Sequence, residues 1–525
     1  MKTRLATVAL TALLAMGALP ALAQDLRIGR SSEQSSIDPQ FSRTGNNQMT
    51  ANMIFGQLVE FDQNLQVSPG LAESWKNIDP LTWEITLRDG VTFHDGSPLT
   101  VEDVIFSLNR ADEVPNSPAP FTDQVAALDK LEKTGDRVLK ITTKSPAPTL
   151  MEDIGRVFIV KQAAVEGKSS EDFANGGAAI GTGPYKFVVW TPGETLRIAA
   201  YDGYWGKKPE FKDVEIRFIA NDAARVAALL SGAVDVIDTV PAADVPKIGS
   251  TKGFRIDEAE SARLIYLGLS MRDETAPPGV TDLAGKPLAA NPFRDARVRK
   301  ALSLMIDRQL IIDRILGGAG VAAGQLVPPA LGGHVPDLGP DQPDAAKAKA
   351  LLTEAGYPEG FGVTVASSND RFPGDADLAQ ALGQMLTRGG LKVNGIEVFP
   401  YNVYSKAATD GSYGAFVFSL GASTPDSAPN LQALLHTYDK AAGKGAFNRV
   451  RFSDPEFDKA LEAAQEQFDE PTRLKMLQEA TTLVFAETPV VPLYWQKLYW
   501  GTRDGLTVKG GLNEYTLPQD VESLK

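Results

Sequence analysis

The chain contains no cysteine among its 525 residues, so it can form neither disulfide bonds nor a cysteine-ligated metal site, and it has no catalytic thiol. Its stability must therefore come from packing alone. A chain of this length is far above the size at which small domains need disulfide bonds for stability. The length instead predicts two or three domains, each with its own core.

The first 23 residues are predicted to be a secretory signal peptide. Lys2 and Arg4 give a charged start, residues 5–19 are apolar, and Ala21-Leu22-Ala23 is a small-x-small cleavage site. A membrane anchor is the less favoured alternative, because the run is short and no stop-transfer segment follows. We expect a mature chain that begins at Gln24. Without a cysteine to carry a lipid it should diffuse freely, and a Gram-negative periplasm is the expected compartment.

The charge balance argues against polyanionic partners. The formal net charge is −14, and removal of Lys2 and Arg4 with the signal makes it −16. Such a surface repels nucleic acid and anionic membranes, and the sequence has no basic run. Because the acidic residues are spread along the chain, solubility explains them.

The first clearly patterned stretch of the sequence predicts a β-hairpin followed by a helix. Residues 81–88 alternate apolar and polar side chains, Asp89-Gly90 provides a turn, and residues 91–93 continue the alternation. Thr100 and Asp103 then form a capping-box-like pair at the start of a helix. This order of elements indicates an α/β or α+β protein.

Two later units repeat strands and helices. In the second, Gly232 ends a helix that lies between strands with short connections, which suggests a βαβ crossover. Its predicted strands are residues 186–189, 195–200, 214–218 and 234–240, and its helix is residues 222–230. In the third, a strand–helix–strand order predicts a separate α/β lobe. Its predicted helices are residues 344–355 and 377–386, and its strands are residues 361–366 and 391–399.

The histidines do not suggest catalysis. None of the three has another histidine at the i+4 spacing of a helical zinc site, and no Gly-x-Ser-x-Gly motif precedes a helix. His94, in Phe93-His94-Asp95-Gly96, is expected to stabilise a turn. His436 lies in a segment that could be a helix facing a cleft, although a solvated or hydrogen-bonded histidine is the preferred interpretation.

Two other motifs do not match known ligand sites. Gly181-Thr182-Gly183 lacks the features of a phosphate loop, and Pro184 removes an amide donor, so a tight backbone crossing is preferred. The acids Asp370, Asp375 and Asp377 do not have the spacing of a calcium loop. We therefore expect no metal and no cofactor.

Three segments resemble the solute-binding proteins of peptide, dipeptide and nickel ABC importers, known as solute-binding family 5. The first is Leu71-Ala72-Glu73-Ser74-Trp75 with Phe93-His94-Asp95-Gly96. The second is Gly181-Thr182-Gly183-Pro184-Tyr185 with Tyr201-Asp202-Gly203-Tyr204-Trp205-Gly206, and the third is Phe293-Arg294-Asp295-Ala296-Arg297-Val298. Together with residues 490–495, the likeness covers essentially the whole mature chain.

The resemblance implies an α/β, two-lobed periplasmic-binding-protein fold of type II, in its large cluster C form with an extra subdomain. On this chain, residues 24–47, 179–268 and 491–525 would form a discontinuous lobe I. Residues 48–178 would form the inserted subdomain, and residues 269–490 would form lobe II. Closure of the lobes around a solute would present a new surface to the membrane permease.

The resemblance also implies ligand residues. In peptide-binding relatives, an aspartate in the segment that matches residues 421–431 pairs with the ligand's amine. Here Ser423 matches that clamp position and Asp426 follows three residues later. Either Asp426 replaces the clamp, or the ligand is not a free-amine peptide.

Arg371 matches the region where dipeptide-binding relatives use an arginine against the ligand carboxylate, a role that its planar fork suits. An equally weighted alternative is a surface arginine that pairs with Asp370 or Asp375. Further candidate ligand residues come from the N-terminal segment and from two aromatic positions. These are Ser32, Glu33, Asn46, Asn47, Trp190 and Tyr404.

The sequence thus predicts a monomeric binding protein, not an enzyme, that delivers a small solute to an inner-membrane ABC permease. A short peptide or peptide-like compound is the leading ligand class, and an opine, a glycoside or a metal chelate is the alternative. A secreted hydrolase with a carboxylate pair is the alternative from a different class. A sensory or chaperone-like role on the same fold also remains open.

Overall fold

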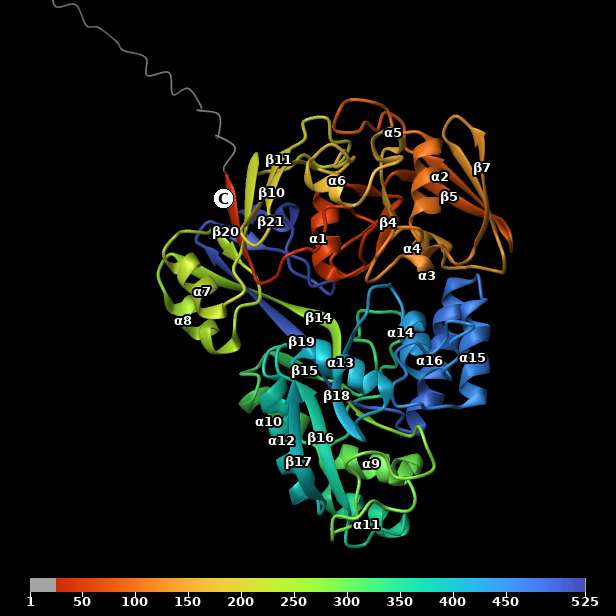
Figure 1. The fold of residues 1–525 in the computed structure, drawn as a ribbon, viewed down its shortest axis with the longest axis vertical. Helices are drawn as coiled ribbons and strands as arrows, with labels where there is room; N and C mark the ends of the chain where they lie inside the picture. Colours follow the sequence, from red (N-terminus) through yellow and green to blue (C-terminus); the bar gives the residue numbers. More distant parts are fainter. Residues whose placement is uncertain (1–24, 525) are drawn as a thin grey trace, which may run out of the picture.

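The computed structural model describes residues 25–524, so the predicted signal peptide lies outside the described residues. One large mixed sheet runs through the molecule in the order β10-β11-β12-β1-β13-β19-β14-β18-β16-β17, and β15 pairs with β19. Figure 1 shows that the long strands β14 and β19 connect the upper part of the molecule to the lower part. The strands of this sheet are β1 (Leu26–Arg30), β10 (Tyr185–Thr191), β11 (Thr195–Ala200), β12 (Asp213–Phe218), β13 (Val236–Ile237), β14 (Phe254–Leu269), β15 (Gly320–Ala322), β16 (Gly362–Ser368), β17 (Lys392–Phe399), β18 (Ala415–Gly421) and β19 (Val491–Arg503).

The other strands form small separate sheets. A four-stranded antiparallel sheet has the order β5-β6-β8-β7, from β5 (Ala72–Asp79), β6 (Thr82–Leu87), β7 (Leu128–Gly135) and β8 (Val138–Thr143). Three strand pairs complete the set: β2 (Gly56–Gln57) with β9 (Phe158–Ile159), β3 (Val59–Phe61) with β4 (Val67–Pro69), and β20 (Leu506–Val508) with β21 (Val521–Ser523).

The helices cover these sheets. Those before β14 are α1 (Gly45–Ile54), α2 (Val101–Arg110), α3 (Thr122–Val125), α4 (Leu150–Ile154), α5 (Gln162–Val165), α6 (Glu171–Ala174), α7 (Asp222–Leu230) and α8 (Val245–Ser250). Those after it are α9 (Ala296–Leu304), α10 (Arg308–Arg314), α11 (Ala345–Glu354), α12 (Asp375–Arg388), α13 (Tyr401–Asp410), α14 (Ala428–Leu435), α15 (Pro455–Gln465) and α16 (Glu470–Ala486). Within residues 25–524, no helix is both long and apolar enough to cross a membrane.

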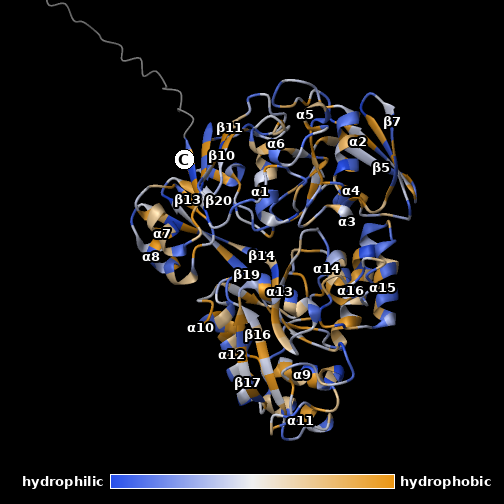
Figure 2. Ribbon diagram, in the orientation of Figure 1, coloured by the Kyte–Doolittle hydropathy of each residue, from blue (hydrophilic) through white to orange (hydrophobic). Residues whose placement is uncertain are grey.

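The buried apolar side chains divide into separate clusters. The largest lies almost entirely between residues 262 and 495, and we call it the lower core. A second cluster, the upper core, combines residues 26–55 with 158–216 and 500–521. A third, the side core, lies within residues 58–159 around the four-stranded sheet. In Figure 2 the strand β16 of the lower core is largely hydrophobic in colour, which agrees with the burial of most of its residues.

The two long strands pass from the upper core to the lower core. On β14, Ala259 packs against the upper core and Ala262 belongs to the lower core. The pairing of β14 with β19 is irregular at this point, because the three residues between Glu260 and Leu264 on β14 lie opposite a single residue of β19. Such a bulge bends a strand locally and re-aims its side chains.

Several local predictions are confirmed. The side chain of Thr100 accepts a hydrogen bond from Asp103 N, and the reciprocal bond completes the capping box at the start of α2. The order β12–α7–β13 is a parallel crossover, since both strands pair in parallel with β1. The predicted strand over residues 234–240 is shorter than expected, because only β13 is paired there.

The predicted hairpin of residues 81–93 is wrong. β6 pairs with β5 and β8, which come earlier and later in the chain, and not with the segment after Asp89-Gly90. That segment makes only an isolated bridge between Thr92 and Pro98. The predicted turn is present, since Gly90 has φ of 72°. The strand before this turn pairs with β5 and β8 and not with the segment that follows the turn.

The Gly181–Gly183 segment is a tight backbone crossing, as predicted. A Cβ atom on Gly181 would lie 2.0 Å from the carbonyl oxygen of Ile54. His94 holds the crossing, because its Nδ1 accepts from Gly181 N and its Nε2 lies 3.0 Å from Gly183 O. Burial lowers the pKa of His94 to about 4, so this histidine is neutral and structural.

Candidate functional site

Arg371 is an arginine without a carboxylate partner in residues 25–524. It lies in the loop before α12, and its guanidinium carbon is 4.8 Å from the ring centroid of Tyr401. The acids beside it are already engaged by backbone amides: Asp370 accepts from Tyr401 N, and Asp375 accepts from Arg371 N. Burial lowers the pKa of Arg371, and nearby Arg263 lowers it further. A cation with this environment is suited to an incoming anion.

The neighbouring Arg263 is paired. It lies in the β14 bulge, and its Nε is 2.9 Å from Oε1 of Glu514. Ser261 also donates its hydroxyl to Glu514. Although burial opposes ionisation, Arg263 holds the pKa of Glu514 below its ordinary value. Glu514 has φ of 65°, a left-handed conformation that is uncommon for a residue other than glycine.

These two residues lie at the junction of the cores. Leu512, just before Glu514, belongs to the lower core, whereas Tyr515, just after it, packs against the upper core. Arg263 follows Ala262 at the same boundary on β14. With Arg371, the junction has two guanidinium groups and one carboxylate, which leaves one net positive charge.

The loop that contains Ser423 begins at this junction. Gly421 pairs with Arg263 across β14 and β18, and a Cβ atom on Gly421 would lie 3.5 Å from the Arg263 guanidinium. The glycine therefore leaves space beside that cation. Ser423 is exposed, and its hydroxyl makes no hydrogen bond within the described chain. Of the residues predicted from sequence, Arg371 and Ser423 are thus associated with the junction.

The side chain of Asp426 is bound to α16 and not to the residues of the junction. It is buried, and its Oδ2 lies 2.8 Å from Nη1 of Arg473 on α16. Burial raises the pKa of Asp426, and Arg473 opposes that shift. Its Oδ1 also accepts from Ala428 N at the start of α14. The carboxylate of Asp426 is therefore already bound by Arg473 and by the Ala428 amide.

The predicted N-terminal residues are hydrogen-bonded to other residues of the chain. The Ser32 hydroxyl donates to Asn46, and Asn47 accepts from Ser35 N. Glu33 accepts from the Trp190 indole at 2.7 Å and from Gly193 N. None of these contacts brings the predicted N-terminal side chains next to Arg371.

The two predicted aromatic residues have different surroundings. Trp190 borders a cavity of about 870 Å³, together with Phe106 and Arg110, on the side of the α2 and α6 helices. Tyr404 is only 1% exposed and donates its hydroxyl to Val417 O inside the lower core.

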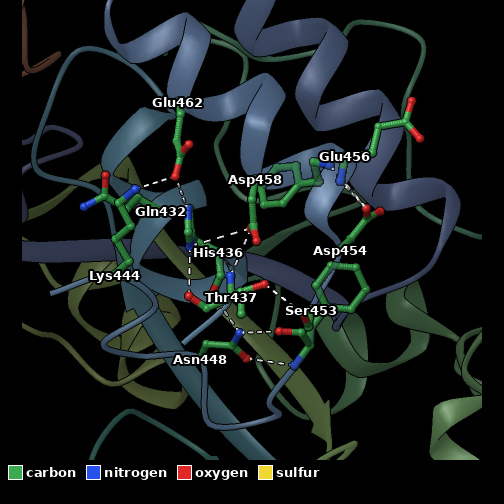
Figure 3. A network of polar contacts seen from close by, with 12 residues as sticks. Gln432, His436, Thr437, Lys444, Asn448, Ser453, Asp454, Glu456, Asp458 and Glu462 are labelled. Atoms are coloured by element: carbon green, nitrogen blue, oxygen red, sulfur yellow. Dashed lines mark hydrogen bonds and ion pairs between the residues drawn. The ribbon is translucent and has the colours of Figure 1, made fainter. Parts of the chain in front are cut away.

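His436 is enclosed in a polar network, shown in Figure 3. Its Nε2 lies 3.0 Å from Glu462, and its Nδ1 lies 2.8 Å from Thr437 O. Asn448 also donates to the His436 carbonyl. The histidine is buried and hydrogen-bonded, as preferred from sequence. Residues 25–524 contain no group of three or more His, Asp or Glu side chains placed to hold a metal ion.

Sequence reasoning missed both residues of the ion pair at the junction, Arg263 and Glu514, and also missed Arg473, which binds Asp426 away from the junction. They come from distant segments and match no motif, so only the fold brings them to their partners. The change from polar to apolar pattern within β14 was the one local signal near Arg263.

The family model for bacterial extracellular solute-binding proteins, family 5 Middle, matches residues 66–442. Two curated relatives span nearly the same length. The heme-binding protein A of Haemophilus influenzae is 26% identical over 85% of this chain and 82% of its own. The glutathione-binding protein GsiB of Salmonella typhimurium is 25% identical over 94% of this chain and 93% of its own.

Among solved structures, HbpA2 from Haemophilus parasuis superimposes with a TM-score of 0.79. It is 23% identical in sequence, and the match covers 96% of this chain and all of that chain. At this identity the likeness concerns the fold.

Proposed function

The chain belongs to the bacterial extracellular solute-binding proteins of family 5, and we propose that it carries a short peptide or peptide-like solute with a carboxylate group. Members of this family are extracellular or periplasmic binding proteins, not enzymes, and serve as the solute-binding component of ABC importers. The hydrolase alternative is therefore set aside. The expected α/β periplasmic-binding-protein fold in its large cluster C form is confirmed.

The observation that carries the proposal is the unpaired guanidinium of Arg371. Arg371 is exposed, so an incoming carboxylate can reach its guanidinium from solvent. Arg371 lies beside Arg263 at the junction of the cores, where one net positive charge remains. A carboxylate bound there would complete the charge balance, and the planar fork of Arg371 would hold both of its oxygens.

The absence of a free acid in the 421–430 loop favours a second ligand class. Asp426 is already bound to Arg473, so it is not free to pair with a ligand amine. The Ser423 hydroxyl can accept a hydrogen bond but carries no charge. This environment supports a non-peptide acid such as an opine, or a peptide whose amine is blocked. Glycosides and metal chelates lack this specific support.

The arrangement of the cores supports a division into lobes. We propose that residues 24–47, 179–268 and 491–525 form lobe I, residues 48–178 the inserted subdomain, and residues 269–490 lobe II. The lobes would close on the solute by bending at the β14 bulge. The closed form would then dock on an inner-membrane permease, so that binding controls docking.

We also propose that the chain is a freely diffusing monomer of a Gram-negative periplasm. The signal-like residues 1–23 and the absence of cysteine support export without a lipid anchor. A sensory role would use the same binding step without a dedicated permease.

Mass spectrometry of small molecules that co-purify with the protein tests the ligand class. It should be followed by a thermal-shift series with free dipeptides, N-acetylated dipeptides, glutathione and opine acids. A ligand at about 100 times its dissociation constant should add about 2.7 kcal/mol of stability. If only uncharged compounds bind, the carboxylate assignment is wrong.

A further inference from the structure

The proposed inserted subdomain contacts proposed lobe II where α4 and β6 meet α16 and the turn before it, and we call this contact the seam. Across the seam, Oε1 of Glu152 lies 3.9 Å from Nη2 of Arg473. The rings of Trp83 and Phe468 also meet there, with centroids 6.4 Å apart. The seam thus has one polar and one aromatic contact, each with a side chain from either side.

Few polar contacts join these two parts of the chain. Within residues 25–524, no hydrogen bond connects residues 48–178 with residues 269–490, and Glu152–Arg473 is the salt bridge that does so. A single substitution at the seam can therefore change how strongly the two parts hold together.

The seam contains more carboxyl groups than its arginine can neutralise. Arg473 is only 6% exposed, and its Nη1 lies 2.8 Å from Oδ2 of Asp426, which is 2% exposed. Neither of these two atoms has a well-aligned hydrogen-bond partner, so the guanidinium is not oriented toward Asp426 alone. It lies between that acid and Glu152. With both acids ionised, a buried region would carry one excess negative charge, which is costly, and one bound proton removes it.

Glu152 is better placed than Asp426 to hold this proton. Asp426 has the closer contact with Arg473 and accepts a hydrogen bond from the Ala428 amide, and both interactions favour its ionised form. The side chain of Glu152 is more distant from the guanidinium and accepts no hydrogen bond within the described part of the chain. Burial raises the pKa of Glu152 to about 8, and the charge of Asp426 adds to this rise while Arg473 opposes it.

The other charged groups near the seam do not supply a free cation. Asp153, next to Glu152 on α4, and Arg156, just after α4, have opposite effects on Glu152. Glu470, the first residue of α16, adds a negative charge near Asp426. Burial also raises the pKa of Asp153 to about 7, so the experiment must separate this acid from Glu152.

We propose that closing the seam takes up one proton, which Glu152 holds, so that the proposed lobes close more readily as the pH falls. The inference rests on the proposed function, because it assumes that the subdomain and lobe II separate when the solute leaves. A solute enclosed between the lobes should accordingly be bound more tightly at lower pH.

The direction of the effect follows from the two states of Glu152. In the separated state the side chain faces water, and its pKa returns to the ordinary value of 4.5, whereas at the seam it is about 8. Its contribution to closure is fully present below pH about 4.5 and is lost as the pH rises through about 8. The ratio of open to closed protein should therefore increase by about 50-fold between pH 6 and pH 8.

The absence of cysteine allows a direct test on the mature full-length protein. Lys130→Cys on β7 and Lys475→Cys on α16 place one spin label on each side of the seam, at two exposed positions. Double electron–electron resonance then gives the distribution of label distances at pH 6 and pH 8 without added solute. We expect the shorter distances to predominate at pH 6 and longer distances to gain population at pH 8.

Three variants in the same labelled background assign the proton. Glu152→Gln imitates the protonated acid, so its distances should stay short at both pH values. Asp153→Asn should retain the wild-type response, and so should Glu166→Gln, which changes an exposed acid of the same subdomain. Loss of the response in Asp153→Asn, with Glu152→Gln like wild type, would show that the wrong acid was chosen.

The outcomes separate this inference from the proposed function. A distance distribution that does not change between pH 6 and pH 8, or a wild-type response in Glu152→Gln, would overturn the proton-coupled seam. The proposed function would stand in that case if acids still bind through Arg371. If the distances respond as expected but Arg371→Ala leaves acid binding unchanged, the ligand assignment is wrong and the seam is supported.

Discussion

Oε1 of Glu152 on α4 lies 3.9 Å from Nη2 of Arg473 on α16, so one arginine faces acids from two parts of the molecule. The same guanidinium is 2.8 Å from Asp426 in its own part. Close by, Trp83 of the four-stranded sheet contacts Phe468 in the turn before α16, with ring centroids 6.4 Å apart. These contacts join the four-stranded sheet and α4 to α16 and the turn before it.

Replacing Arg473 should destabilise the protein strongly. Arg473→Ala leaves Asp426 buried without a counter-charge, which we expect to cost about 3–5 kcal/mol of unfolding free energy. Lys475→Ala on the same helix removes an exposed lysine and should change stability by about 0.5 kcal/mol or less. Urea unfolding measures both variants. Equal midpoints for the two would show that the Asp426 pair is not needed.

Glu152 predicts how stability depends on pH. Its pKa in the folded protein is raised from 4.5 to about 8, so the folded state favours the protonated acid. Its contribution is fully present below pH about 4.5 and is lost as the pH rises through about 8. Glu152→Gln should therefore flatten the pH profile and unfold at a higher urea concentration than wild type at pH 8. The difference should be at most a few kcal/mol.

Urea midpoints at pH 5 and pH 8 test this expectation. Glu166→Gln, an exposed change in the same predicted subdomain, should follow the wild-type profile. A Glu152→Gln profile parallel to wild type would contradict the assignment of the pH dependence to this residue.

The glycine crossing predicts a sharp contrast between two nearby glycines. Gly181→Ala would place its Cβ 2.0 Å from the Ile54 carbonyl oxygen, which forces backbone movement, and we expect a loss of about 3 kcal/mol or failure to fold. Gly177→Ala meets nothing within 4 Å and should be nearly neutral. Soluble yield and urea midpoint distinguish them, and indistinguishable variants would refute the steric account.

Local sequence signals predicted most elements where neighbouring residues decide the structure. The Thr100–Asp103 capping box and the β16–α12–β17 unit depend on side chains and periodicity within a few turns. The 81–93 hairpin failed because alternation identifies a strand but not its partner. β6 found its partners in β5 and β8, and sequence spacing gives no information on such pairings.

The candidate site was predictable only in part. Arg371 was identified through a family resemblance, and its lack of a partner depends on two backbone amides that occupy Asp370 and Asp375. Asp426 looked free in the sequence, yet Arg473, nearly fifty residues later, binds it. Such competition for charged groups is decided by tertiary packing, so a single sequence does not reveal it.

Affinity for a carboxylate solute, measured with and without Arg371, tests the central claim most directly. Isothermal titration should use the tightest-binding acid of the thermal-shift series with wild type, Arg371→Ala and the control Arg388→Ala, which changes an exposed arginine at the far end of α12. We predict that Arg371→Ala weakens binding by about tenfold or more, as loss of a charge-assisted contact implies, while Arg388→Ala binds like wild type. Unchanged affinity in Arg371→Ala would contradict the account.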